Sequence, residues 1–230
     1  ELEALYRHYR PKTVDNKNWK NLYHQQLDDI LAKFEAGHWK EGREYIDETV
    51  VSIDPPGCRD IDDAVSIKLL SPELWQLSIH IADVSLWVED GSPLSIVASE
   101  LGSTLYGLRE NFPIFPRELS EGIFSLLPEK ERATLTLKIT LDKSRVVSWS
   151  FHKSYIKNRN TLNYENYNSE TAIDWGDLFS CAEILADELG LPEIDNDSHK
   201  LVEILMIYYN YRIAEMGSGI YRVQSAKDTN

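Results

Sequence analysis

The stretch Ser52-Ile-Asp-Pro-Pro-Gly-Cys-Arg-Asp-Ile-Asp-Asp-Ala64 decides how this chain is interpreted. It places four carboxylates, those of Asp54, Asp60, Asp62 and Asp63, within ten residues and between two apolar segments. We call residues 54–63 the acidic loop. The Pro-Pro-Gly sequence after Asp54 predicts a tight bend that returns Asp54 toward Asp62 and Asp63. Two carboxylates about 5 Å apart repel each other by roughly 3 kcal/mol at an effective dielectric near 20. The loop therefore either binds a cation or spreads its side chains into solvent.

The residue types of the acidic loop indicate which cation it would take. All its candidate ligands are oxygens, and no His lies nearby, which favours Mg²⁺ or Mn²⁺ over Zn²⁺. The alternating acidic positions and terminal Glu of a calcium-binding EF-hand are missing. A carboxylate site for Mg²⁺ usually leaves positions for water and phosphate oxygens, so this pattern suits hydrolysis of a phosphodiester.

The pattern of apolar residues around the loop predicts a mixed fold. Apolar residues recur every three or four positions over residues 16–36, which predicts a helix ending at Gly37. Ser92 before Pro93 predicts the cap of a helix that runs to residue 101, and Asp197 or Ser198 predicts another cap. A further helix is expected over residues 178–189. Alternating or continuous apolar runs predict strands at residues 50–53, 64–70, 75–82, 134–141 and 146–151. The fold class is α+β, or mixed α/β, with a largely antiparallel sheet flanked by helices.

Composition limits the function classes. The 230 residues carry 38 acidic against 24 basic side chains, a formal charge of −14. A free-standing nucleic-acid binder usually has the opposite sign. If this chain handles nucleic acid, a metal ion, a narrow channel or basic modules outside the chain must help; otherwise the charge indicates a soluble acidic surface. No apolar run approaches the roughly 20 residues of a membrane helix, so we expect no membrane association. Two cysteines make no disulfide framework, so we expect an intracellular protein, cytoplasmic or nuclear.

Several blocks in a fixed order carry a family resemblance. After the acidic loop come His80-Ile-Ala-Asp-Val-Ser85, Gly91-Ser-Pro-Leu94, Gly102-Ser-Thr-Leu-Tyr106, Pro113-Ile-Phe-Pro-Arg-Glu-Leu-Ser120, Phe124-Ser-Leu-Leu-Pro128, Ser198-His-Lys-Leu-Val-Glu203 and Gly219-Ile-Tyr-Arg-Val223. Over about residues 49–223 the chain resembles the RNB catalytic domain of ribonuclease II, ribonuclease R and the eukaryotic exosome-associated exoribonuclease. The resemblance implies an RNB-type fold for residues 49–230, C-terminally incomplete, with residues 1–48 as a helical lead-in or linker.

The resemblance also implies a function and its residues. The family removes nucleotides from the 3′ end of single-stranded RNA by Mg²⁺-dependent hydrolysis and releases nucleoside 5′-monophosphates. Its metal-binding aspartates match Asp54, Asp60, Asp62 and Asp63, with Asp60 and Asp62 as catalytic residues. The RNA-binding positions match Tyr106, Tyr164 and Glu203. At the last of these the family has a pair of glutamates, whereas this chain has Glu203 followed by Ile204. His80 and Asp83 belong to the signature as structural residues, and Arg59 is left unassigned.

The chain also departs from the family pattern. The family has an arginine that contacts the scissile phosphate in a block well downstream, and this chain contains no such block before Asn230. Counterparts of an aromatic hairpin after residue 189 and of the OB-fold modules that feed RNA are also missing. We therefore expect either part of a longer enzyme, with OB-fold modules or a larger RNA-decay complex as partners outside this chain, or a catalytically silent module that binds RNA or scaffolds a complex. An acidic protein-interaction domain without an RNA role is the third hypothesis.

Overall fold

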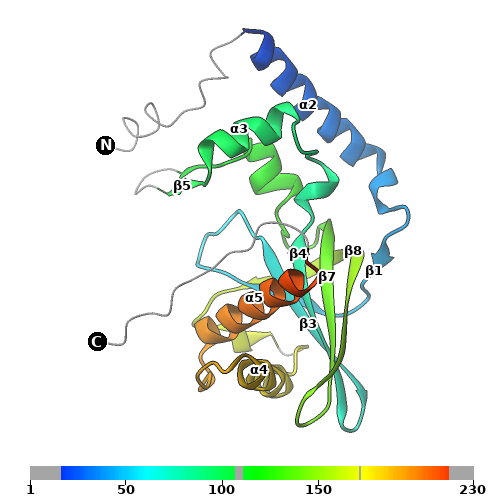
Figure 1. Cartoon of the computed structure of the whole chain (residues 1–230), viewed down its shortest axis with the longest axis vertical. Helices are drawn as coiled ribbons and strands as arrows, with labels where there is room; N and C mark the ends of the chain where they lie inside the picture. Colours follow the sequence, from blue (N-terminus) through cyan, green and yellow to red (C-terminus); the bar gives the residue numbers. More distant parts are fainter. Residues whose placement is uncertain (1–16, 107–110, 171, 218–230) are drawn as a thin grey trace.

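A curved sheet backed by two helices forms most of the molecule, and a smaller helical body lies at one end of it (Figure 1). The computed structural model describes residues 17–106, 111–170 and 172–217. The predicted helix start at Asn16 and the block at residues 219–223 lie outside them. Within the described residues the fold mixes helices with a mostly antiparallel sheet, which confirms the predicted class. No helix in the described part of the chain is both long and apolar enough to span a bilayer.

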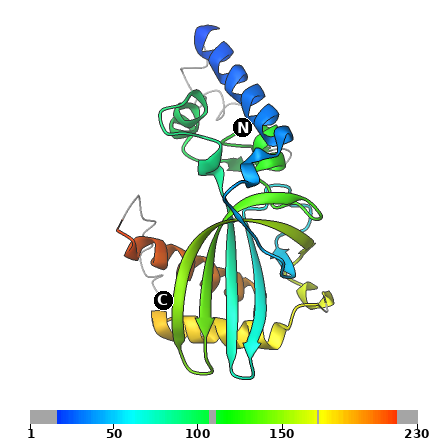
Figure 2. The same cartoon turned by 90° about the vertical axis from the view of Figure 1, so that its right-hand side faces the viewer.

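The main sheet closes on itself. Its strands follow the order β1-β8-β2-β3-β4-β7, and β7 also pairs with β8, so β2, β3, β4, β7 and β8 form a ring. β8 runs parallel to β1 and β2, and every other pairing is antiparallel. Figure 2 shows the long strands curving side by side. The strands are β1 (Glu44–Tyr45), β2 (Val50–Ile53), β3 (Asp63–Ser71), β4 (Leu74–Ala82), β7 (Glu131–Leu141) and β8 (Val146–Leu162).

β8 is longer than predicted. The sequence predicted a strand that ends at residue 151, whereas β8 continues to Leu162. Its first part pairs with β7 as far as Lys157, and its last part, from Asn158, pairs with β2. The second half carries several charged and polar residues, so its extended conformation depends on pairing with a strand that lies about a hundred residues earlier in the chain. This pairing is what closes the ring.

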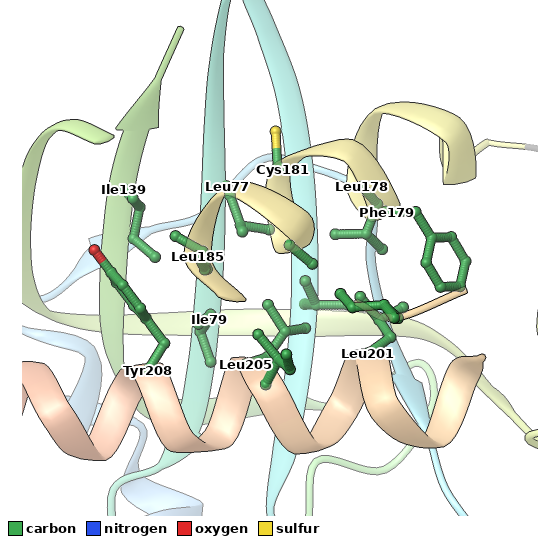
Figure 3. Close-up of a cluster of buried hydrophobic side chains, with 14 of the residues drawn as sticks. Leu77, Ile79, Ile139, Leu178, Phe179, Cys181, Leu185, Leu201, Leu205 and Tyr208 are labelled. Atoms are coloured by element: carbon green, nitrogen blue, oxygen red, sulfur yellow. The ribbon is translucent and has the colours of Figure 1, made fainter. Parts of the chain in front are cut away.

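Two helices cover one face of the sheet. α4 (Trp175–Leu189) and α5 (Ser198–Glu215) pack on the strands, and leucines from both helices meet Leu77, Ile79 and Ile139 (Figure 3). α4 begins three residues earlier than predicted because Asp174 accepts a hydrogen bond from the Asp177 N–H and caps the helix. The cap predicted at Asp197 is confirmed, since its carboxylate accepts from the His199 N–H at 2.8 Å.

The helical body contains α2 (Lys17–Ala36), α3 (Pro93–Leu101), the 3₁₀ turn η3 (Val84–Leu86), the π turn η4 (Leu119–Ile123) and the short pair β5 (Leu105–Tyr106) and β6 (Asn111–Phe112). The predicted cap of α3 is confirmed, since Ser92 accepts from the Ser95 N–H. A separate apolar cluster holds this body together: Leu27, Ile30, Trp87, Leu94, Leu119, Ile123 and Phe124. In the described part of the chain, two further 3₁₀ turns are η2 (His38–Lys40) and η5 (Tyr167–Ser169).

The segment between the helical body and β2 belongs to the sheet. β1 pairs in parallel with β8, and the buried side chain of Ile46 joins a small apolar cluster beneath the acidic loop. The division of the chain at residues 48 and 49 stays a prediction, but β1 adds to the sheet from the N-terminal side of that division.

Candidate functional site

The acidic loop connects two neighbouring antiparallel strands. Asp54 follows β2 directly and Asp63 is the first residue of β3, so both ends of the loop are fixed at the same end of the sheet. In Figure 1 the loop extends from the end of the sheet that faces the helical body. The Asp54 N–H donates to the carbonyl of Leu162 at 2.9 Å. Gly57 has a φ of 81°, a left-handed conformation that permits the bend predicted after Asp54.

Ile61 fastens the middle of the loop. Its side chain is only 1% exposed and lies in the apolar cluster with Val50, Ala64, Leu126 and Ile156. Asp60 and Asp62 flank this buried residue, so the burial of Ile61 keeps the backbone of both aspartates against the protein. The backbone is held as well: the Leu126 N–H donates to the Ile61 carbonyl at 2.9 Å.

Burial and mutual repulsion govern the charges of the loop. Burial raises the pKa of Asp63 to about 7, and the negative charges of Asp54 and Asp62 add to the shift. The pKa of Asp62 rises to about 6, and that of Asp54 also rises, in both cases mainly through burial and further through the charge of Asp60. The side chain of Asp62 is exposed to solvent, whereas that of Asp63 is half-buried, so solvent screens the charge of Asp62 more than that of Asp63. Without a cation, the carboxylates in this loop destabilise one another.

Asp54 offers the clearest sign of a missing partner. Its Oδ2 atom is buried, and among the described residues no group hydrogen-bonds to it. A buried carboxylate oxygen without a partner is costly, and a cation would satisfy it. The oxygen-only donor set fits Mg²⁺ or Mn²⁺. However, no three His, Cys, Asp or Glu side chains of the described ranges are already gathered as a ligand set, so the metal site stays a prediction.

The structure brings Tyr106 to the acidic loop. Tyr106 belongs to β5 in the helical body, and its hydroxyl donates to Oδ2 of Asp60 at 3.2 Å. Burial and the charge of Asp60 raise the pKa of Tyr106, so the hydroxyl stays protonated. The side chain is nevertheless 68% exposed, which leaves its ring open to stacking.

Tyr164 lies beyond the end of β8. Burial raises its pKa, and the charges of Asp54 and Asp63 contribute, so its hydroxyl lies within electrostatic reach of the acidic loop. One face of its ring stacks on His199, with ring centroids 3.9 Å apart and planes inclined by 11°. Ser198 donates to the Tyr164 carbonyl at 2.8 Å and ties this residue to the start of α5.

Glu203 is not brought to the loop. It lies on the exposed side of α5, whereas its neighbour Ile204 is 5% exposed and faces the core. Among the described residues, no hydrogen bond or ion pair joins Glu203 to the acidic loop. Its assignment to RNA binding remains a prediction.

A polar hollow of about 320 Å³ adjoins Asp54. One side consists of residues 54–58, and the other of residues 160–163 with Asn166 and Ser169. Asp54 therefore has solvent-accessible space beside it. Cys58, on the same side, donates its S–H to Asp60, and burial raises the pKa of its thiol to about 12, so it is not a reactive thiolate.

The signature residues expected to be structural are confirmed as such. His80 is fully buried and lies within hydrogen-bonding distance of the Ser66 and Thr136 hydroxyls. The carboxylate of Asp83 forms a buried ion pair with Arg43 at 2.5 Å. Arg59, which the sequence left unassigned, is exposed and lies 3.8 Å from a carboxylate oxygen of Glu121.

Sequence reasoning gave no role to Ser125. Its side chain is fully buried, and its hydroxyl bonds to the backbone of the acidic loop on both sides of Asp60. The block Phe124-Ser-Leu-Leu-Pro128 includes this serine but does not indicate its contacts, because its partners lie more than sixty residues earlier in the chain.

Comparison with known proteins identifies the family. A family sequence profile described as RNB domain matches residues 43–175, more than half of the chain. The chain belongs to the RNB domain family. Among curated relatives, ribonuclease R of Thermotoga maritima is 37% identical over 123 residues, which are 53% of this chain and 17% of that protein. Exosome complex exonuclease RRP44 homolog A of Arabidopsis thaliana is 37% identical over 116 residues, 50% of this chain and 12% of that protein. The chain thus spans less than a fifth of these RNB relatives.

Solved structures share the RNB fold. Ribonuclease R of Mycoplasma genitalium, in complex with ribose-methylated single-stranded RNA, superposes with a TM-score of 0.67 at 21% identity. The match covers 77% of this chain and 34% of the other. Yeast Ssd1, described as a pseudonuclease, superposes with a TM-score of 0.57 at 23% identity, over 67% of this chain and 20% of that one. At these identities the superpositions show the fold alone.

Proposed function

We propose that this chain is the metal-binding portion of a 3′→5′ exoribonuclease that hydrolyses single-stranded RNA to nucleoside 5′-monophosphates. The observation that carries the proposal is the acidic loop, whose four aspartates keep the family order at one end of the sheet. One of them, Asp54, has a buried carboxylate oxygen with no hydrogen-bond partner among the residues that the structure describes. The exoribonuclease relatives support the reaction class.

The charge of the site explains why a cation is needed. RNA phosphates would be repelled by the carboxylates of the acidic loop, and the chain as a whole carries a formal charge of −14. Asp54, Asp60, Asp62 and Asp63 would hold Mg²⁺. When bound, the ion supplies charge neutralisation at the phosphate and lowers the pKa of an attacking water.

The tyrosines supply a way to hold the RNA. The exposed ring of Tyr106 contacts the acidic loop from the helical body, and the partly buried Tyr164, just after β8, is influenced by the charges of Asp54 and Asp63. Any base can stack on an aromatic ring, and each stacked base contributes roughly 1–3 kcal/mol to the binding free energy. We propose that these rings position the terminal nucleotides while the aspartates act on the phosphodiester. Basic modules or a larger RNA-decay complex outside this chain would add the attraction for RNA that its own charge lacks.

The test uses single-stranded RNA labelled at its 5′ end, incubated with the chain in Mg²⁺ or in EDTA. The proposal predicts products that shorten stepwise from the 3′ end in Mg²⁺ only, and loss of this activity in Asp62→Asn. Asp187→Asn is the matched control, because it makes the same change of charge at an exposed position of α4. Internal cleavage, or cleavage that persists in EDTA, would contradict the proposal.

A catalytically silent RNB module is the second candidate. It is supported by one observation: yeast Ssd1, which is described as a pseudonuclease, shares the fold, so the fold by itself does not bring nuclease activity. This candidate predicts that the chain binds single-stranded RNA in Mg²⁺ without shortening it, and that Asp62→Asn leaves this binding unchanged.

A further inference from the structure

The hydroxyl of Ser125 bridges the two peptide groups on either side of Asp60. It donates to the carbonyl of Arg59 at 2.7 Å and accepts from the N–H of Ile61 at 3.0 Å. These two groups belong to the planar peptides before and after Asp60, and the backbone between two peptide planes has only the φ and ψ of the intervening residue to rotate. Holding both planes therefore fixes both dihedrals of Asp60 and the direction of its side chain.

The backbone at Ser125 and at the next residue is hydrogen-bonded to side chains from two strands of the sheet. Ser125 is fully buried, and its own carbonyl accepts from Nε of Arg132 at 2.9 Å. Arg132 belongs to β7 and is itself buried, with its guanidinium 5.2 Å from the ring centre of Phe34. The next residue, Leu126, donates from its N–H to Ile61 and accepts from the Asn158 amide at 2.7 Å. Residues 125 and 126 are thus held by side chains from the paired strands β7 and β8.

A hydrogen bond from outside the loop also holds the backbone of Asp62, the next aspartate. The Ala82 N–H donates to the carbonyl of Asp62 at 2.9 Å, and the Leu126 N–H holds the carbonyl of Ile61. The backbone from Arg59 to Asp62 is therefore bonded to groups outside the loop at four points. Ser125 makes two of these bonds, and it makes them with a side chain, which a single substitution can remove.

We infer that Ser125 is a positioning residue that orients Asp60, and through the shared backbone Asp62, for cation binding. This inference rests on the proposed function, because it takes the acidic loop to be the metal site. A serine hydroxyl both donates and accepts strong hydrogen bonds through a single atom of a short side chain. Alanine would leave two buried peptide groups without partners and would release the rotation of Asp60. Cysteine keeps the shape but is a weak donor and acceptor, so it should act in the same direction with a smaller effect.

Two measurements on the full chain test the inference. Hydrogen exchange followed by mass spectrometry, in EDTA, reports on residues 59–62 without any metal. Calorimetric titration with Mg²⁺ reports on the site. For Ser125→Ala we expect exchange in this segment to become about tenfold faster or more. The affinity for Mg²⁺ should fall about tenfold or more, as for other residues that support metal ligands. Ser125→Cys is measured in the same way and is the variant used if Ser125→Ala does not fold.

The matched control is Ser154→Ala. Ser154 is also fully buried, and its hydroxyl bonds to Thr134 and Thr136 on β7; among the described residues, no hydrogen bond joins it to the acidic loop. This variant loses a buried hydroxyl but should keep both the exchange of residues 59–62 and the Mg²⁺ affinity of the unchanged chain. If it reproduces the Ser125→Ala effects, general destabilisation explains them and the inference is wrong.

The two measurements separate the inference from the proposed function. Unchanged exchange at residues 59–62 in the Ser125 variants overturns the inference, whatever the metal does. Faster exchange with unchanged Mg²⁺ affinity also overturns it, because the loop would then need no positioning. If the unchanged chain binds no Mg²⁺, the proposed function fails, and the exchange result alone decides whether Ser125 holds Asp60.

Discussion

The hydroxyl of Tyr106 and the carboxylate of Asp60 are 3.2 Å apart, although 46 residues separate them in the sequence. The bond joins the helical body to the acidic loop, since Tyr106 lies on β5 and Asp60 lies between β2 and β3. It also leaves most of the tyrosine ring exposed. One residue thus contacts a predicted metal ligand and presents a stacking surface.

Tyr106→Ala should weaken binding of single-stranded RNA roughly 5- to 150-fold, the equivalent of losing one stacked base. Tyr106→Phe keeps the ring and should bind RNA nearly as well as the unchanged chain. Fluorescence anisotropy with labelled RNA, in an Asp62→Asn background that prevents turnover, measures both. Equal affinities for the Ala and Phe variants would show that the ring does not stack.

Asp63→Asn should stabilise the chain when no metal is present. The folded-state pKa of Asp63 is raised from 3.8 to about 7, so ionised Asp63 destabilises the folded chain above that pH, and this penalty is absent below the unfolded value. At pH 8 in EDTA we expect a gain of about 1–3 kcal/mol in the free energy of unfolding. Thermal unfolding measures it. Added Mg²⁺ should stabilise the unchanged chain and the Asp187→Asn control, but not Asp63→Asn; equal stabilisation of all three would exclude Asp63 as a ligand.

The buried ion pair of Arg43 and Asp83 should be costly to break. Both side chains are less than 10% exposed, and Arg43 also donates to the carbonyls of Thr134 and Ser154. Arg43→Ala leaves an uncompensated buried carboxylate, which should lower the free energy of unfolding by about 3–5 kcal/mol. Lys143→Ala removes an exposed pair with Glu73 and should cost less than about 1 kcal/mol. Urea unfolding compares the two, and equal losses would contradict the structural role of Arg43.

His80 should make stability depend on pH in the acidic range. Burial lowers its pKa from 6.5 to about 3, so the unfolded chain takes up a proton between these values that the folded chain does not. Unfolding is therefore favoured as pH falls below about 6.5. His80→Gln cannot titrate. Relative to this variant, the unchanged chain should lose roughly 2 kcal/mol of stability between pH 6.5 and 4.5. Urea unfolding at several pH values measures the difference, and a difference that stays constant with pH would contradict the prediction.

Local sequence patterns were sufficient to predict much of the secondary structure. Hydrogen bonding within a few residues determines helix caps, which is why Ser92 and Asp197 could be identified from sequence. Apolar alternation identified β3, β4 and β7 because one face of each strand packs into the core. The acidic loop was recognised because its aspartates and the Pro-Pro-Gly bend are adjacent in the chain.

Non-local pairing could not be predicted in this way. The second half of β8 carries charged residues and has no strong strand pattern, and it is extended because β2 pairs with it. The closing of the ring and the parallel position of β1 follow from the same long-range contacts. The family resemblance assigned Glu203 to RNA binding; α5 exposes its side chain to solvent, and this assignment stays a prediction.

The amino-acid sequence by itself determined the fold class, the family and the identity of the four loop aspartates, because these depend on residue type, spacing and order along the chain. Only the tertiary structure decided which distant groups surround those aspartates. Tyr106 reaches Asp60 from the helical body, and Ser125 holds the peptides on both sides of Asp60 from beneath. Hydrogen bonds are directional and act over about 3 Å, so their partners are set by how the elements pack and not by their distance along the chain.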